Sequence, residues 1–173
     1  DSYEALNKAL EGYSEHLVTG DIGCYTLGFL PPYRAIDTCL CMGGSVSMAK
    51  GAAEAGAHPV VGVVGDSTFL HSGISPLVDA VAGSVNMTLF ILDNSTTAMT
   101  GGQETILPSS KLAKLVEGIG VEADHIRVIE PLKKHHDQNV SILREEIEHR
   151  GVSVVIALRE CIQTIKTKKK GVE

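Results

Sequence analysis

Two side chains with metal-binding oxygens follow two apolar segments of the sequence. Asp66 stands just past the run 60–64, and Asn94 stands just past the run 88–92. Between the runs, apolar residues recur at helical spacing. A strand–helix–strand unit brings the carboxyl ends of two parallel strands together, so Asp66 and Asn94 are expected to converge. A carboxylate and an amide oxygen suit a hard cation such as Mg²⁺, which takes its remaining ligands from a bound phosphate and water.

Alternating strands and helices would hold these side chains in place. The predicted strands cover residues 16–20, 35–41, 60–64, 88–92, 125–129 and 152–158, and helical patterns lie before, between and after them. Because the strands lack polar alternation, they indicate a sheet buried on both faces. The expected fold is α/β: a three-layer α/β/α arrangement around a mostly parallel six-stranded sheet. Ligands bind beyond the carboxyl ends of such strands, where every candidate motif falls.

Charge, hydropathy and cysteine content exclude some classes of function. The chain has 173 residues and a net charge of −6, and it has no basic patch inside the domain, which argues against a nucleic acid partner. No apolar run approaches the length of a membrane span, so no membrane partner is expected. The four cysteines form no metal or disulfide pattern and suggest reduced thiols and a cytoplasmic location. We expect one domain over residues 1–160 and a basic tail over 161–173. Since the chain starts at Asp1 and not at Met, it is also expected to be a piece of something longer.

Each candidate residue also has a structural interpretation. Asp66 could instead be the N-cap of the following helix, and Asn94 could instead be an ordinary turn residue after its strand. Gly43, Gly44 and Ser45 open a helix of small residues, where backbone N–H groups can approach a phosphate, although close packing against the sheet would also require small residues. His71 follows the third strand and would either stabilise charge and move a proton near neutral pH or only pack its loop.

Four segments carry a resemblance to a known family. Gly65-Asp66-Ser67 and Asp93-Asn94 resemble the two ends of the thiamine diphosphate fingerprint. Four longer segments follow one another in the order found in indolepyruvate ferredoxin oxidoreductases: 20–28 (GDIGCYTLG), 37–43 (DTCLCMG), 65–73 and 92–101. The chain is therefore similar to the diphosphate-binding domain of the large subunit in that family.

The resemblance implies a set of cofactor and metal contacts. Asp66, Asn94 and the backbone carbonyl of Thr96 would bind Mg²⁺, and the loop from Ile22 would lie over the ring system of the cofactor. The complete set implied for thiamine diphosphate is Ile22, Gly23, Cys24, Tyr25, Met42, Gly43, Gly44, Ser45, Gly65, Asp66, Ser67, Thr68, Asn94, Thr96, Thr97, Ala98 and Met99. His71 would lie near the reactive carbon as the candidate catalytic residue.

The resemblance also implies a reaction and partners. The family decarboxylates a 2-oxoacid oxidatively, here indolepyruvate or another arylpyruvate, passes electrons through iron–sulfur clusters to ferredoxin, and transfers the acyl group to coenzyme A. The activating glutamate comes from a pyrimidine-binding domain or second subunit, and the iron–sulfur clusters belong to a domain absent from this chain. The chain is therefore expected to be inactive alone and to work in a homo- or hetero-oligomer.

Three other functions stay open at this point. The chain could be the diphosphate-binding subunit of a non-oxidative thiamine-dependent 2-oxoacid decarboxylase. It could also be a non-catalytic module that binds thiamine diphosphate. A nicotinamide-binding Rossmann domain is disfavoured, because no G-x-G-x-x-G follows the first predicted strand.

Overall fold

A single six-stranded sheet organises the part of the chain that the structure describes, residues 1–160 of a computed structural model. The strand order is β2-β1-β3-β4-β8-β7, and every neighbouring pair is parallel. The strands are β1 (Leu17–Gly20), β2 (Thr38–Cys39), β3 (Val60–Gly65), β4 (Met87–Asp93), β7 (Ile126–Ile129) and β8 (Val152–Leu158). The two central strands β3 and β4 are almost wholly buried, which explains their continuous runs of Val, Ile, Leu and Phe.

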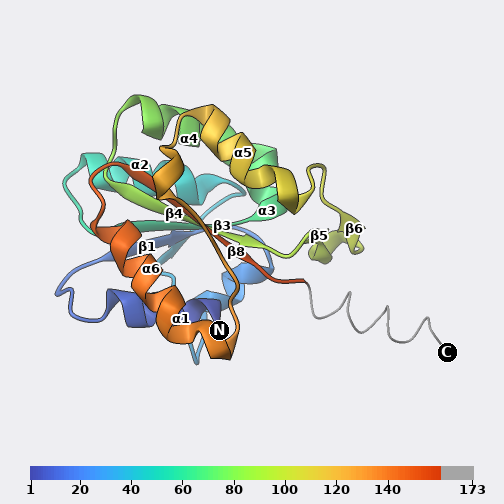
Figure 1. The fold of residues 1–173 in the computed structure, drawn as a ribbon, viewed down its shortest axis with the longest axis horizontal. Coiled ribbons are helices and arrows are strands. Elements are labelled where there is room, and N and C mark those ends of the chain that lie inside the picture. The colour runs from blue at the N-terminus through green and yellow to red at the C-terminus, as the bar shows by residue number, and fades with distance from the viewer. Residues whose placement is uncertain (161–173) are drawn as a thin grey trace.

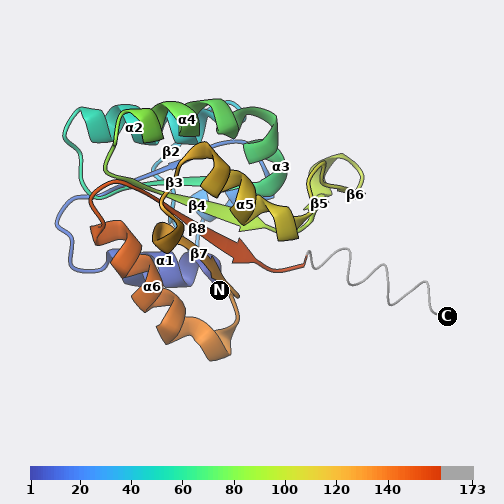
Figure 2. The same cartoon turned by 45° about the horizontal axis from the view of Figure 1, so that its top comes forward.

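Helices cover both faces of the sheet, as Figures 1 and 2 show. One face carries α1 and α6, and the other carries α2, α4 and α5. The helices are α1 (Ser2–Leu10), α2 (Gly44–Glu54), the short α3 (Asp66–Thr68), α4 (Ile74–Ala82), α5 (Ser109–Ile119) and α6 (His136–Glu148). The predicted three-layer α/β/α fold is confirmed.

Two hydrophobic cores lie on opposite faces of the sheet because successive strand residues point in opposite directions. In β3, Val61 and Val63 pack beneath α1 and α6, whereas Val60 and Val64 pack beneath α2 and α4. Phe90 of β4 joins the first core, and the residues on either side of it join the second. Cores on both faces fix each strand against slipping by one residue, since a slip would exchange the two faces.

The second predicted strand is shorter in the structure than the sequence pattern suggested. Only Thr38 and Cys39 pair with β1, although Ala35 and Ile36 are buried. Asp37 accounts for the later start, because its Oδ2 accepts a hydrogen bond from the backbone N–H of Val18 at 2.7 Å. A side chain therefore takes the place of a backbone partner at the start of this strand.

Two further segments were not anticipated in detail. After Asp66–Thr68 the chain forms one turn of π-helix, η2 (Phe69–Gly73), before α4 begins. Past β4, the strands β5 (Thr96–Thr97) and β6 (Gln103–Glu104) form a small antiparallel hairpin beyond the ends of β4 and β8 (Figure 2). Among the described residues, no helix is long and apolar enough to cross a membrane. The predicted basic tail, 161–173, lies outside these residues.

Candidate functional site at the carboxyl edge of the sheet

The candidate residues meet where β1, β3 and β4 end. β3 and β4 are in register up to the pair Gly65 and Leu92, so Asp66 and Asp93 follow on adjacent strands. The loops after β1 and β2 reach the same edge, since both strands run parallel to β3. Parallel pairing thus assembles segments that are widely separated in the sequence.

Asp66 is buried, with 5 % of its surface exposed, and each of its carboxylate oxygens accepts one backbone N–H. Ser67 donates to Oδ1 at 2.7 Å, and Ser95, in the loop after β4, donates to Oδ2 at 2.9 Å. Burial raises the pKa of Asp66 to about 7, and the neighbouring Asp93 adds to the increase, although both N–H groups oppose it. The carboxylate therefore lies in surroundings that lack a compensating positive charge.

Asp93 completes this acidic pair and ties β4 to α5. Its Oδ1 accepts the N–H of Ser95 at 2.9 Å and the hydroxyl of Ser109, the first residue of α5, at 2.7 Å. Its Oδ2 is buried and has no hydrogen-bond partner among residues 1–160. The contacts of Oδ1 hold the loop after β4 in place.

Asn94 and Thr96 lie beside Asp66 in the turn after β4. Asn94 Oδ1 accepts the N–H of Thr96 at 3.0 Å, which shapes the turn, and Thr96 pairs with Glu104 in the hairpin. The hydroxyls of Ser67 and Thr97 are 2.8 Å apart and join the Asp66 segment to the same hairpin. The structure therefore brings the predicted ligands Asp66, Asn94 and Thr96 into one region.

This set of donors fits a hard cation that is held only partly by protein. The oxygen atoms come from a carboxylate, an amide and a backbone carbonyl, the types that Mg²⁺ prefers. In the described part of the chain, no three His, Cys, Asp or Glu side chains gather into a complete metal site. A cation here would need outside ligands such as phosphate oxygens, and it would offset the charge buried at Asp66.

The N-terminus of α2 faces this edge, and Gly43 makes its geometry possible. Gly43 has a φ of +79°, and a Cβ there would lie 2.4 Å from Ser72 Oγ. The N–H of Gly44 donates to the carbonyl of Cys41 at 2.8 Å. Ser45 directs both its N–H and its hydroxyl at Asp21. Phosphate binding by Gly43, Gly44 and Ser45 thus stays a prediction, and two of their backbone donors already have protein partners.

The loop after β1 turns Tyr25 inward. The Tyr25 hydroxyl donates to Asp21 Oδ1, and the ring lies so close to Gly65 that a Cβ there would be 2.5 Å from Tyr25 Cε1. Ile22 is 44 % exposed and Cys24 is exposed, so these two residues face the open side of the edge. Their contact with a cofactor stays a prediction, and Tyr25 serves in this structure to hold the loop.

Asp21 is the important residue that the sequence analysis did not single out. It is fully buried and connects the β1 loop with α2 through Tyr25 and Ser45. A signal was present, because Asp21 directly follows an apolar strand just as Asp66 does.

His71 lies in η2, and its Nδ1 is 3.1 Å from Ser72 Oγ. The Ser72 hydroxyl also donates to the carbonyl of Met42 at 2.8 Å, which places His71 next to the loop before α2. His71 is exposed at the open edge, and its catalytic role stays a prediction. Thr68, another predicted contact, donates to the carbonyl of Ile22 at 3.3 Å. Ala98 and Met99 begin the turn inside the hairpin, where Met99 is 65 % exposed.

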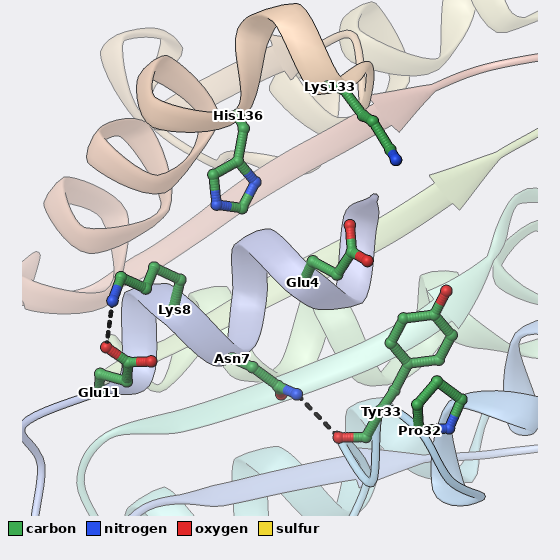
Figure 3. A pocket seen from close by; sticks show the side chains of 8 residues that line it. All are labelled: Glu4, Asn7, Lys8, Glu11, Pro32, Tyr33, Lys133 and His136. Atoms are coloured by element: carbon green, nitrogen blue, oxygen red, sulfur yellow. Dashed lines mark hydrogen bonds and ion pairs between the residues drawn. The ribbon is translucent and has the colours of Figure 1, made fainter.

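A hollow of about 580 Å³ lies apart from these residues, at α1 and α6. Figure 3 shows Glu4, Asn7 and Lys8 of α1, and Glu11 just after it, beneath His136 of α6. Lys8 is engaged with Glu11 at 2.6 Å, and none of the predicted site residues lines the hollow. The candidate site is therefore the open edge and not this cavity.

Comparison with known proteins identifies the family of most of the chain. Residues 21–157 match the family described as thiamine pyrophosphate enzyme, C-terminal TPP binding domain. The matched range includes all of the predicted site residues.

Curated relatives carry one name. The chain is 36% identical over 170 residues to indolepyruvate oxidoreductase subunit IorA of Archaeoglobus fulgidus, covering 92% of this chain and 27% of that protein. It is 40% identical over 154 residues to the subunit of the same name from Methanothermobacter thermautotrophicus, covering 82% of this chain and 24% of the relative. The chain thus spans about a quarter of the length of these relatives.

Solved structures show the same fold. A 2-oxoglutarate:ferredoxin oxidoreductase from Magnetococcus marinus superposes with a TM-score of 0.75 at 16% identity, over 98% of this chain and 65% of that one. Benzoylformate decarboxylase from Polynucleobacter necessarius gives 0.68 at 15% identity, over 92% and 32%. The predicted resemblance is confirmed by the sequence matches, and since the family match covers most of its length, the chain belongs to the family of C-terminal thiamine pyrophosphate-binding domains of thiamine pyrophosphate enzymes.

Proposed function

We propose that this chain forms the diphosphate- and Mg²⁺-binding half of a thiamine diphosphate site in a 2-oxoacid:ferredoxin oxidoreductase. The observation that carries the proposal is the position of Asp66, a buried carboxylate with a raised pKa beside Asn94 at the ends of adjacent strands. A buried carboxylate without a positive partner is costly, and a bound cation would remove that cost.

Each group at the edge has a distinct task in this proposal. Asp66, Asn94 and the carbonyl of Thr96 hold the cation, which in turn holds the diphosphate. The loop from Ile22 to Tyr25 and the hairpin residues from Thr97 to Met99 limit where the cofactor rings can lie. When bound, thiamine diphosphate supplies a carbanion that adds to the keto carbon of a 2-oxoacid. The chain contributes orientation, which lowers the entropic part of the barrier.

The proposed substrate is indolepyruvate or another arylpyruvate, with coenzyme A as acyl acceptor and ferredoxin as electron acceptor. Support for indolepyruvate as the substrate comes from the names of the relatives, which are subunits of an indolepyruvate oxidoreductase. Because the chain spans about a quarter of those relatives, the activating glutamate and the iron–sulfur clusters are assigned to other domains or subunits. The chain alone is therefore expected to be inactive.

The surface of the edge supports a partner that covers the site. Among residues 1–160, the exposed large hydrophobic residues, apart from Val78 and Val128, lie in segments 22–42 and 99–106 and at the end of β8. We call this set the apolar rim: Ile22, Leu27, Phe29, Leu30, Leu40, Met42, Met99, Ile106 and Leu158. Apolar surface gathered around a site indicates an interface, here with a pyrimidine-binding domain or a second subunit.

The test is calorimetric titration of thiamine diphosphate into the assembled oxidoreductase, with Mg²⁺ and then with EDTA. Binding is expected to require the metal and to be abolished by Asp66→Ala. The matched control is Asp79→Ala, an exposed carboxylate on α4 that pairs with Lys50 at 3.1 Å and lies outside the site. Cofactor binding that persists in EDTA or in Asp66→Ala would refute the metal site. Reduction of ferredoxin with formation of an acyl-CoA, as opposed to release of an aldehyde, would separate the oxidative reaction from simple decarboxylation.

A further inference from the structure

Asp21 is a carboxyl residue in the interior with no cationic partner among residues 1–160. None of its surface is exposed, and its hydrogen-bond donors are the Tyr25 hydroxyl, the Ser45 hydroxyl at 2.6 Å and the Ser45 N–H at 3.3 Å. Ser45 is the second residue of α2, so the carboxylate also lies at the positive end of that helix dipole. Three hydrogen-bond donors and a helix N-terminus therefore converge on this buried side chain.

The contacts of Asp21 reach two parts of the proposed cofactor site. Oδ1 accepts from Tyr25, which belongs to the loop proposed to lie over the cofactor rings. Oδ2 accepts from Ser45, which begins the helix proposed to face the diphosphate. One carboxylate therefore sets the separation between the ring-facing loop and the phosphate-facing helix.

Tyr25 extends this connection to the metal-binding strand. Its ring lies against Gly65, the residue before Asp66, and its backbone carbonyl accepts the Tyr3 hydroxyl at 2.5 Å. The backbone of Asp21 is held as well, because its carbonyl accepts the Thr26 hydroxyl at 2.5 Å. Hydrogen bonds from Tyr3 and Thr26 thus hold the backbone at Tyr25 and at Asp21, on either side of the loop.

We propose that Asp21 is a positioning residue whose buried carboxylate locks the 22–25 loop and the N-terminus of α2 into the arrangement that receives thiamine diphosphate. This inference rests on the proposed function of the edge. Asp21 does not touch the cofactor itself, because it is enclosed by the groups that it orients.

The experiment compares Asp21→Ala and Asp21→Asn with the wild type in the assembled protein. An amide keeps the shape and one acceptor, so Asp21→Asn should retain part of the function that Asp21→Ala loses. The apparent affinity for thiamine diphosphate at saturating Mg²⁺ is expected to fall about 10- to 100-fold in Asp21→Ala, as for residues that orient metal ligands. The matched control is Asp37→Asn, which changes another carboxylate that accepts one backbone N–H and lies away from the edge residues.

Hydrogen exchange measured on the cofactor-free protein gives a second and independent readout. Asp21→Ala should speed exchange in residues 22–26 and 43–47 together. Tyr25→Phe should affect mainly the first segment and Ser45→Ala mainly the second, each with a smaller, about two- to tenfold, loss of cofactor affinity. These two variants also keep the proposal testable if Asp21→Ala does not fold.

Two results would overturn the proposal. One is that the wild type binds thiamine diphosphate and both Asp21 variants bind it equally tightly, even if their melting temperature is lower. The other is unchanged exchange in the two segments. Failure of the wild type to bind the cofactor at all would instead refute the proposed function, and the exchange comparison would still decide whether Asp21 joins loop and helix.

Discussion

At the scale of single residues, the two carboxylates that end β3 and β4 are the least satisfied charged groups of the edge. Among residues 1–160, the hydrogen bonds to Asp66 come from backbone N–H groups, and Asp93 Oδ2 has no hydrogen-bond partner. Burial, together with the neighbouring Asp93, raises the pKa of Asp66. A cation bound beside Asp66 would offset the charge of its buried carboxylate.

The raised pKa makes the stability of the metal-free protein depend on pH. The pKa of Asp66 is about 7 in the folded chain and 3.8 in the unfolded reference, so the folded protein keeps a proton that the unfolded chain loses between these values. The free energy of unfolding should therefore fall as pH rises from about 4 to 7, since the folded state binds more protons there. Thermal unfolding at several pH values in EDTA measures this.

Asp66→Asn isolates the contribution of this group. The variant should lose the decline with pH and should be more stable than the wild type at pH 8 without metal. Adding Mg²⁺ should raise the melting temperature of the wild type more at pH 8 than at pH 6, because the metal binds the ionised carboxylate. Parallel pH profiles for wild type and Asp66→Asn would contradict the assignment.

At the scale of elements, the start of α2 depends on an unusual backbone conformation. Gly43 has a positive φ, and the space beside it is filled by Ser72 of η2, which also binds the carbonyl of Met42. The π-helical turn and the start of α2 therefore fit together only with glycine at position 43. This explains why a small residue is needed there even before any phosphate is considered.

Gly43→Ala should destabilise the protein by about 1–3 kcal/mol, because alanine in a left-handed conformation is strained and its Cβ meets Ser72. Gly51→Ala is the matched control in the same helix, where an added Cβ meets no atom within 4 Å. It should stabilise by about 0.4–1 kcal/mol, because alanine loses less backbone entropy on folding. Denaturant titration measures both changes, and equal effects of the two variants would refute this account.

At the scale of the whole molecule, most of the exposed large apolar residues lie in chain segments that also carry candidate site residues. The two cores cover both faces of the sheet, yet the side chains of the apolar rim stay exposed. Leu27 is 68 % exposed and Leu40 57 %, both close in sequence to proposed cofactor contacts. An interface at this position would also shield the site from water.

The double variant Leu27→Glu/Leu40→Glu should weaken assembly with the partner domain or subunit about tenfold or more, because it places charges in an apolar interface. The stability of the chain itself should change by no more than about 0.5 kcal/mol, since both side chains are exposed. Val78→Glu, at an exposed apolar residue of α4, is the control. Light scattering after size-exclusion chromatography measures assembly, and equal effects of the control would argue against the rim as interface.

The order and type of the main elements follow from the sequence alone. Strands buried on both faces need continuous apolar runs, and helices covering them need apolar residues at helical spacing, so both leave local patterns. Five of the six strands lie within one residue of their predicted bounds, and parallel pairing then brings the segments of Asp66 and Asn94 to the same edge. The strand β2 was predicted too long, and at its start the side chain of Asp37, not a backbone carbonyl, accepts the N–H of Val18. That exchange leaves no periodic signal.

The contacts that hold the edge together could not be read from the sequence. Asp21, Tyr25, Ser45 and Gly65 come from three separate segments, and their contacts depend on which strands are neighbours. The pKa of Asp66 also depends on the tertiary structure, through burial and through Asp93 at the end of the adjacent strand. A local sequence pattern indicates on which face of a strand or helix a residue lies. Burial, charge and hydrogen bonding between distant segments arise only when the chain has folded.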